Sequence, residues 1–127
     1  MAEEITAPSS RLVAEVEARS GQPVNRCFQC RKCAGGCPLG FAMEKYNADI
    51  MRLIQLGERE AVLRSNAIWL CVGCRVCAAR CPNGIDGSQV MDALRAMALA
   101  DGIAGSDWRT LAFYRAFLAS VERRGRA

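Results

Sequence analysis

A cysteine run that occurs twice constrains this chain of 127 residues more than any other feature of its sequence. Both copies read C-x2-C-x2-C-x3-C-P, the first over residues 27–38 and the second over residues 71–82. All eight cysteines of the chain lie in these copies. In order, they are Cys27, Cys30, Cys33 and Cys37, followed by Cys71, Cys74, Cys77 and Cys81.

This spacing is the bacterial ferredoxin run, in which one loop provides three thiolates to a [4Fe–4S] cluster. In two-cluster proteins the fourth cysteine ligates the other cluster, and the proline behind it turns the chain away. The sequence therefore predicts two [4Fe–4S] clusters with crossed ligation. The predicted ligands are Cys27, Cys30, Cys33 and Cys81 for the first cluster, and Cys71, Cys74, Cys77 and Cys37 for the second.

Two other uses of the cysteines fit the sequence less well. Zinc ribbons pair two C-x2-C units across a long gap, and a third cysteine two residues on has no place at a tetrahedral ion. A disulfide framework suits a short secreted chain. However, the residues that follow Met1 lack the apolar core of a signal peptide. Both interpretations rank below the clusters.

The basic balance of the sequence does not indicate a nucleic-acid partner. The formal net charge is +4, and fifteen of the seventeen basic residues are arginines. Eight thiolates bring about −8 and two oxidised clusters roughly +4, which leaves the loaded chain near zero. The chain has no histidine, which excludes Rieske-type ligation and histidine general bases. No apolar run approaches the roughly 18 residues of a membrane span, so we expect a soluble, cytoplasmic protein.

The segments around the cysteine runs show helical periodicity and no strand-like alternation of useful length. The predicted fold class is all-α: an α-helical ferredoxin whose two cluster-binding loops are bridged and flanked by short helices. Residues 1–9 are expected to be a flexible terminus and residues 10–127 a single domain. Capping residues and glycines predict helices from Ser10 to Gly21, over residues 41–56 and 58–66, from Asp86 to Gly102, and from Ser106 to Gly125.

Several residues in or beside the runs are candidates for tuning the clusters. Cations near sulfur ligands stabilise reduced clusters, although exposed cations contribute little. These cations are Arg31, Lys32 and Arg75. Gly35 and Gly36 are expected to let the backbone pass close to a cluster and donate amides to it. Trp69, just before the second run, can either shield a cluster from water or pack in the core.

The last predicted helix carries an apolar arc wider than one core-facing stripe requires. It contains half of the aromatic residues of the chain. Such a helix is either wrapped fully by its own domain or meets a second surface, for which aromatic anchors are favoured. The arc comprises Trp108, Leu111, Phe113, Tyr114, Phe117, Leu118 and Val121.

The two runs together with three further stretches resemble the HdrC family, the small iron–sulfur subunits of heterodisulfide reductase. These stretches are Ile68–Cys74, Arg95–Ala98 and the tail from Phe117 to Arg126, and the resemblance covers residues 20–125. It implies a small electron-transfer subunit between a flavoprotein partner and a catalytic partner that performs disulfide chemistry. The resemblance leaves open whether the terminal substrate is a heterodisulfide or another sulfur compound.

The residues themselves point to electron transfer without substrate chemistry. No spare cysteine, histidine or phosphate-binding glycine loop is present, so we expect no catalytic residue in this chain. The alternatives are a freely diffusing two-cluster ferredoxin or an iron–sulfur subunit of another respiratory oxidoreductase. Free carriers are typically acidic and present no wide apolar helix, which favours a subunit of a larger oxidoreductase complex.

Overall fold

The computed structural model of the protein describes residues 2–103 and 108–125. These residues form helices and no strand, which confirms the predicted all-α fold class. Two 3₁₀ turns, Val24–Arg26 and Gly40–Ala42, interrupt the connections. The α-helices are α1 (Ala2–Ser20), α2 (Lys32–Gly36), α3 (Asn47–Gln55), α4 (Arg59–Leu63), α5 (Ala67–Leu70), α6 (Val76–Arg80), α7 (Gly87–Ala100) and α8 (Trp108–Arg124).

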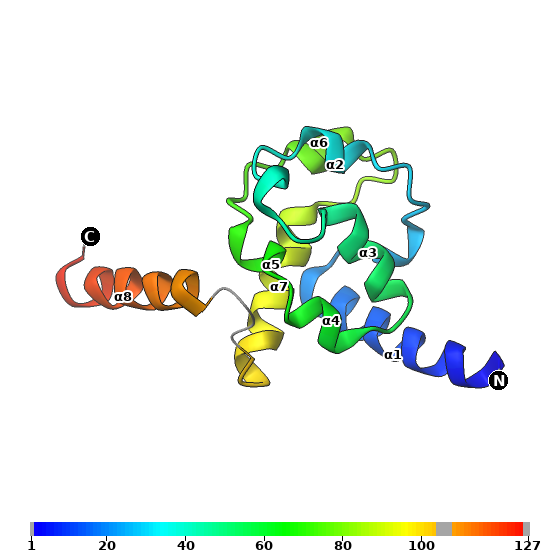
Figure 1. Ribbon diagram of the computed structural model, residues 1–127, viewed down its shortest axis with the longest axis horizontal. Coiled ribbons are helices and arrows are strands. Elements are labelled where there is room, and N and C mark those ends of the chain that lie inside the picture. Colours follow the sequence, from blue (N-terminus) through cyan, green and yellow to red (C-terminus); the bar gives the residue numbers. More distant parts are fainter. Residues whose placement is uncertain (1, 104–107, 126–127) are drawn as a thin grey trace.

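The helices divide into a packed body and one projecting element (Figure 1). The cysteine runs, with α2 and α6, lie at the top of the view, and helices α1, α3, α4 and α7 lie below them. Helix α1 packs against α3 and α7, while α4 and α5 pack against α7. Helix α8 extends sideways from this body. The cysteine runs therefore form one end of a small helical bundle.

The core of the bundle contains the apolar stripes that the sequence indicates. Its buried side chains include Leu12, Val13 and Val16 of α1, Ile50 and Ile54 of α3, and Val90, Leu94, Met97 and Ala98 of α7. Residues that flank the cysteine runs are buried in the same core, namely Val24, Trp69 and Ile85. Each large buried side chain contributes about 1.5–3 kcal/mol, so the core holds the ends of both runs in place.

Helix α1 begins at Ala2, before Ser10, where the sequence predicts its N-cap. Acidic residues at positions 3 and 4 favour an earlier start because they interact well with the N-terminal end of a helix dipole. The expected flexibility of residues 1–9 and the single-domain boundary at residue 10 stay predictions.

The predicted helices between the runs are present but shorter than expected. Helix α3 begins at Asn47, because the Tyr46 N–H bonds to the carboxylate of Asp49 at 3.1 Å and starts the helix there. The predicted helix over residues 58–66 is divided into α4 and α5. At the division, the Asn66 side chain bonds to the loop before α3, accepting from the Glu44 N–H at 2.8 Å.

The predicted helix ends are confirmed. Four glycines with positive φ follow helices α1, α3, α7 and α8, in the conformation that commonly stops a helix. They are Gly21, Gly57, Gly102 and Gly125. Asp86 caps α7, accepting a hydrogen bond from the Ser88 N–H at 3.0 Å. The predicted cap at Ser106 lies outside the described residues.

Helices α2 and α6, which lie inside the cysteine runs, pack against each other. They were expected to be loops, but each forms an α-helix five residues long. The guanidinium Nε of Arg80 donates to the carbonyl oxygen of Lys32 at 2.6 Å and joins the pair. This crossing brings the two runs together although more than thirty residues separate them in the sequence.

Candidate iron–sulfur sites

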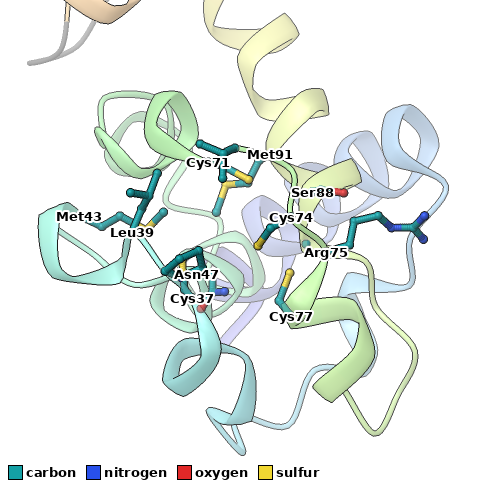
Figure 2. Close-up of a pocket in the computed structure, with 13 residues that line it drawn as sticks. Cys37, Leu39, Met43, Asn47, Cys71, Cys74, Arg75, Cys77, Ser88 and Met91 are labelled. Carbon is teal, nitrogen blue, oxygen red and sulfur yellow. The ribbon is translucent and has the colours of Figure 1, made fainter.

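Four cysteines line a cavity between the two runs, which we call the Cys71 site (Figure 2). Cys71, Cys74 and Cys77 come from the second run, and Cys37 is the last cysteine of the first. Cys37 approaches from the opposite side of the cavity to the other three. Apolar side chains complete the lining, among them Leu39, Met43 and Met91. The cavity therefore combines thiols with a surface that excludes water.

A second cavity, which we call the Cys27 site, has the reciprocal composition. The first run supplies three of its cysteines, and the last cysteine of the second run supplies the fourth. These cysteines are Cys27, Cys30, Cys33 and Cys81. The structure thus groups the eight cysteines in the two sets that the sequence predicts to be ligand sets.

The two loops share an unusual backbone conformation at equivalent positions. Gln29 and Arg31 in the first run have φ of 63° and 65°, and Gly73 and Arg75 in the second have 73° and 66°. Left-handed conformations are uncommon for residues other than glycine, and persist where the surrounding structure imposes them. Here they curl each loop tightly before its third cysteine.

An ion pair restrains each of these strained arginines. The Arg31 Nη1 lies 2.7 Å from a carboxylate oxygen of Asp49 in α3, and this hydrogen bond lowers the pKa of Asp49. The Arg75 Nε lies 3.0 Å from Asp86, the N-cap of α7. Figure 2 shows that the Arg75 side chain points away from the cavity. Both arginines therefore bind the loops to the helices behind them.

Burial and hydrogen bonding act in opposite directions on Asp86. Burial raises the pKa of this carboxyl, but hydrogen bonds from Ser88 and the charge of Arg75 outweigh that effect and lower the pKa. Asp86 is therefore an ionised partner for Arg75 at neutral pH.

Gln29 is a contact of the first loop that the cysteine spacing does not predict. Its side-chain amide lies 3.4 Å from the Cys27 Sγ and donates to the Ala48 carbonyl oxygen at 2.9 Å. The second run has Gly73 at the equivalent position. This difference between the copies is visible in the sequence and marks where the two sites diverge.

The matched family covers both sites. Residues 26–86 match the family described as 4Fe-4S dicluster domain, and this range includes all eight cysteines. The chain carries a 4Fe-4S dicluster domain. It binds two [4Fe–4S] clusters, as the cysteine spacing predicts.

Curated relatives of this dicluster protein confirm the resemblance to heterodisulfide reductase. The iron–sulfur subunit of the CoB–CoM heterodisulfide reductase of Methanopyrus kandleri that matches the chain is 34% identical over 91 residues, which cover 72% of this chain and 47% of the relative. A protein of Archaeoglobus profundus, named as similar to the same type of subunit, is 32% identical over 96 residues, covering 74% and 51%. The chain spans about half the length of these relatives.

The thiols of the dicluster domain are buried enough to resist ionisation when no iron is bound. Burial raises the pKa of Cys33, Cys71 and Cys77, and backbone N–H groups only partly offset it. Iron ligation requires thiolates, so the positive charge of the metal is needed to hold these cysteines in their ionised form.

The spacing of side chains in the dicluster domain fits clusters better than single ions. Within residues 2–103 and 108–125, no three His, Cys, Asp or Glu side chains are grouped as ligands of one metal ion. A [4Fe–4S] cluster needs no such grouping, because each thiolate binds a different iron. This arrangement disfavours the zinc interpretation. Among the same residues, no helix is long and apolar enough to cross a membrane.

Proposed function

We propose that this chain relays single electrons through its two [4Fe–4S] clusters as one component of a heterodisulfide-reductase-like complex. The observation that carries the proposal is the pair of four-cysteine cavities, each completed by a cysteine from the other run. Because the two sites share the runs that build them, an electron can pass between two cofactors held in one rigid frame.

The proposed ligands follow the composition of the two cavities. Cys27, Cys30, Cys33 and Cys81 hold one cluster, and Cys71, Cys74, Cys77 and Cys37 hold the other. A bound cluster supplies a one-electron acceptor and donor. The chain's own part is to keep the thiolates in place, to exclude water with Leu39, Met43 and Met91, and to fix the loops through Arg31 and Arg75.

The partners and the location belong to the same proposal. We infer that the chain works between a flavoprotein and a catalytic protein of a heterodisulfide-reductase-like complex, and that substrate chemistry occurs on those partners. The names of the relatives as components of heterodisulfide reductases support this role. We also infer a cytoplasmic location, where thiols are kept reduced.

A freely diffusing ferredoxin is the competing function. The exposed apolar side chains of α8 favour a component of a complex, because a carrier that must stay soluble and release its partners gains nothing from such a face. Phe113, Phe117 and Leu118 are all exposed on this helix.

Anaerobic purification of the chain, alone and from its native extract through an affinity tag, tests the function. Two clusters require about eight iron and eight acid-labile sulfide per chain. The isolated chain should be reducible and reoxidisable without turning over any disulfide, and the tagged complex should reduce or form a disulfide. Elution of the native protein as a lone small chain would instead support the diffusing ferredoxin.

A further inference from the structure

Helix α8 contacts the body through one part of its surface and leaves another part open. Leu111 is 8% exposed, and the Tyr114 hydroxyl donates to the Trp69 carbonyl oxygen at 3.0 Å. In contrast, Phe113 and Phe117 stack with ring centroids 6.2 Å apart while remaining 63% and 45% exposed. The wide apolar arc predicted from the sequence is thus divided between a packed contact and an uncovered row.

This uncovered row forms one wall of a groove of about 750 Å³, here named the α8 groove. The opposite wall comes from α7 through Arg95 and Leu99. The cysteine run itself contributes Cys71, Val72 and Gly73 to the lining. A molecule seated in the groove would therefore touch the loop that encloses the Cys71 site.

Arg95 joins the wall of the groove to that loop. Its guanidinium donates to the carbonyl oxygens of Ile68 and Cys71, and it lies 5.7 Å from the centroid of the Tyr114 ring. Helix α7, helix α8 and the second cysteine run consequently meet at one side chain. The groove is a fixed part of the Cys71 site and does not depend on the Cys27 site.

The charge on α8 indicates the chemistry of an occupant. Along Trp108–Arg124 a single acid, Glu122, stands against four arginines. These arginines are Arg109, Arg115, Arg123 and Arg124. A partner that matches this helix presents apolar side chains flanked by aspartate or glutamate, since complementary charge steers association and fixes its register.

We propose that the α8 groove is the docking surface of an electron-transfer partner with an acidic, apolar contact segment. Electrons enter or leave this chain at the Cys71 site, because that site lies against the docked partner. The proposal rests on the proposed function and deepens it by assigning one cluster to one partner surface.

Photocrosslinking in the anaerobic, affinity-purified complex tests the docking surface. A p-benzoylphenylalanine probe replaces Phe117 in one variant and Phe41 in the control, which is 85% exposed and does not line the groove. The Phe117 probe should attach to an acid-rich segment of a flavin or iron–sulfur protein, and the Phe41 probe should not reach that segment. A crosslink from Phe117 to a second copy of this chain, or none at all, overturns the proposal.

A binding measurement with the crosslinked partner, purified, separates the two levels of inference. Phe117→Ala should weaken association about tenfold or more, as truncation of a buried interface aromatic does, whereas Phe41→Ala should change it less than about twofold. Equal effects of both variants contradict the docking surface. If the partner binds through the groove but the complex handles no disulfide, the docking proposal stands and the proposed function fails.

A separate observation concerns Gly87, the first residue of α7. A Cβ atom at this position would lie 2.7 Å from the Cys77 Sγ, closer than any side chain tolerates. The Gly87 N–H donates to that sulfur, as does the N–H of Ala78. In the first run, the equivalent Cys33 receives a backbone hydrogen bond from Ala34, the counterpart of Ala78. Gly87 thus adds a donor at the start of a 14-residue helix.

We infer from this second observation that the cluster in the Cys71 site has the higher reduction potential of the two. An N–H donor at the positive end of a helix dipole stabilises a sulfur ligand more when the cluster carries the additional electron. Arg95, whose guanidinium bonds to the Cys71 carbonyl, adds positive charge beside the same site. The paired charges of Arg75 and Asp86 largely cancel. A single electron therefore rests at the Cys71 site.

Redox titration of the loaded chain followed by electron paramagnetic resonance tests the order of the potentials. Gly87→Ala should lower the midpoint potential of the first cluster to be reduced, while Gly35→Ala, whose Cβ has only an ordinary 3.5 Å contact, should not. If Gly87→Ala prevents cluster loading, ligand substitution provides the second measurement. Cys37→Ser should alter the first signal that appears, and Cys81→Ser the later one. The reverse assignment overturns the inference.

Discussion

Gly36 in α2 leaves the space that Arg80 of α6 needs: a Cβ on Gly36 would lie 2.6 Å from the Arg80 Cδ. The two residues are equivalent positions of the repeated run, three residues after the third cysteine. The copies therefore pack as a small residue against a large one. The sequence predicts that Gly36 lets the backbone approach a cluster, but the close contact in the structure is with the other helix.

Gly36→Ala should destabilise the crossing of α2 and α6 by about 1–3 kcal/mol, the usual cost of overpacking. Both sites depend on the crossing, so both clusters should be lost faster in denaturant, as measured by the decay of visible absorbance. Gly35→Ala is the matched control, because its Cβ would have only an ordinary contact with Arg80. Equal decay rates for the two variants would show that the packing does not hold the runs together.

Crossed ligation predicts which cysteine substitutions act on the same cluster. Cys37→Ala combined with Cys74→Ala removes two ligands of one site and should leave about four iron per chain. Cys37→Ala combined with Cys30→Ala affects both sites and should leave the chain nearly without iron. Iron and sulfide analysis distinguishes these double variants. The opposite pattern would mean that each run ligates its own cluster.

The left-handed conformation of Arg75 should make the side chain at this position matter in two separable ways. Arg75→Asn keeps a residue that tolerates positive φ and removes only the ion pair with Asp86, which at an exposed guanidinium contributes up to about 1 kcal/mol. Arg75→Val adds the strain of a β-branched residue at positive φ, about 1–2 kcal/mol more.

The measurement is the rate of cluster loss at a fixed urea concentration, which should be fastest for Arg75→Val. The same pair of substitutions at Arg31 provides a control in the first run, where φ is 65°. Indistinguishable rates for the Asn and Val variants would mean that the loop changes conformation freely when the cluster is bound.

The ligand sets could be predicted from the sequence because ligand spacing within a run is local chemistry. Periodicity was equally informative for α7, where Val90, Leu94 and Met97 are buried as expected. It could not reveal α2 and α6, since helices of five residues are too short to show a repeat. Contacts such as that between Gly87 and Cys77 depend on how α7 meets the loop, which no local pattern specifies.

The arc on α8 shows the same limit from another side. Its composition indicated that the helix has more apolar surface than its own domain needs, and the exposure of Phe113 and Phe117 agrees. The pattern could not say that Leu111 and Tyr114 are the residues that hold the helix, because they have the same apolar character as their neighbours.

The hydroxyl of Tyr114 is expected to control how firmly α8 is held. Tyr114→Phe retains the ring that lies 5.7 Å from the Arg95 guanidinium and removes only the hydrogen bond to the Trp69 carbonyl oxygen. An intramolecular hydrogen bond contributes about 0.5–1.5 kcal/mol, so local opening of α8 should become roughly 2–10 times more frequent. Hydrogen exchange of the α8 amides measures this opening, with the α7 amides as the internal reference. Phe113→Leu is the matched control, since Phe113 is exposed. Faster exchange in α7 as well would place Tyr114 in the global stability of the domain and not in the attachment of α8.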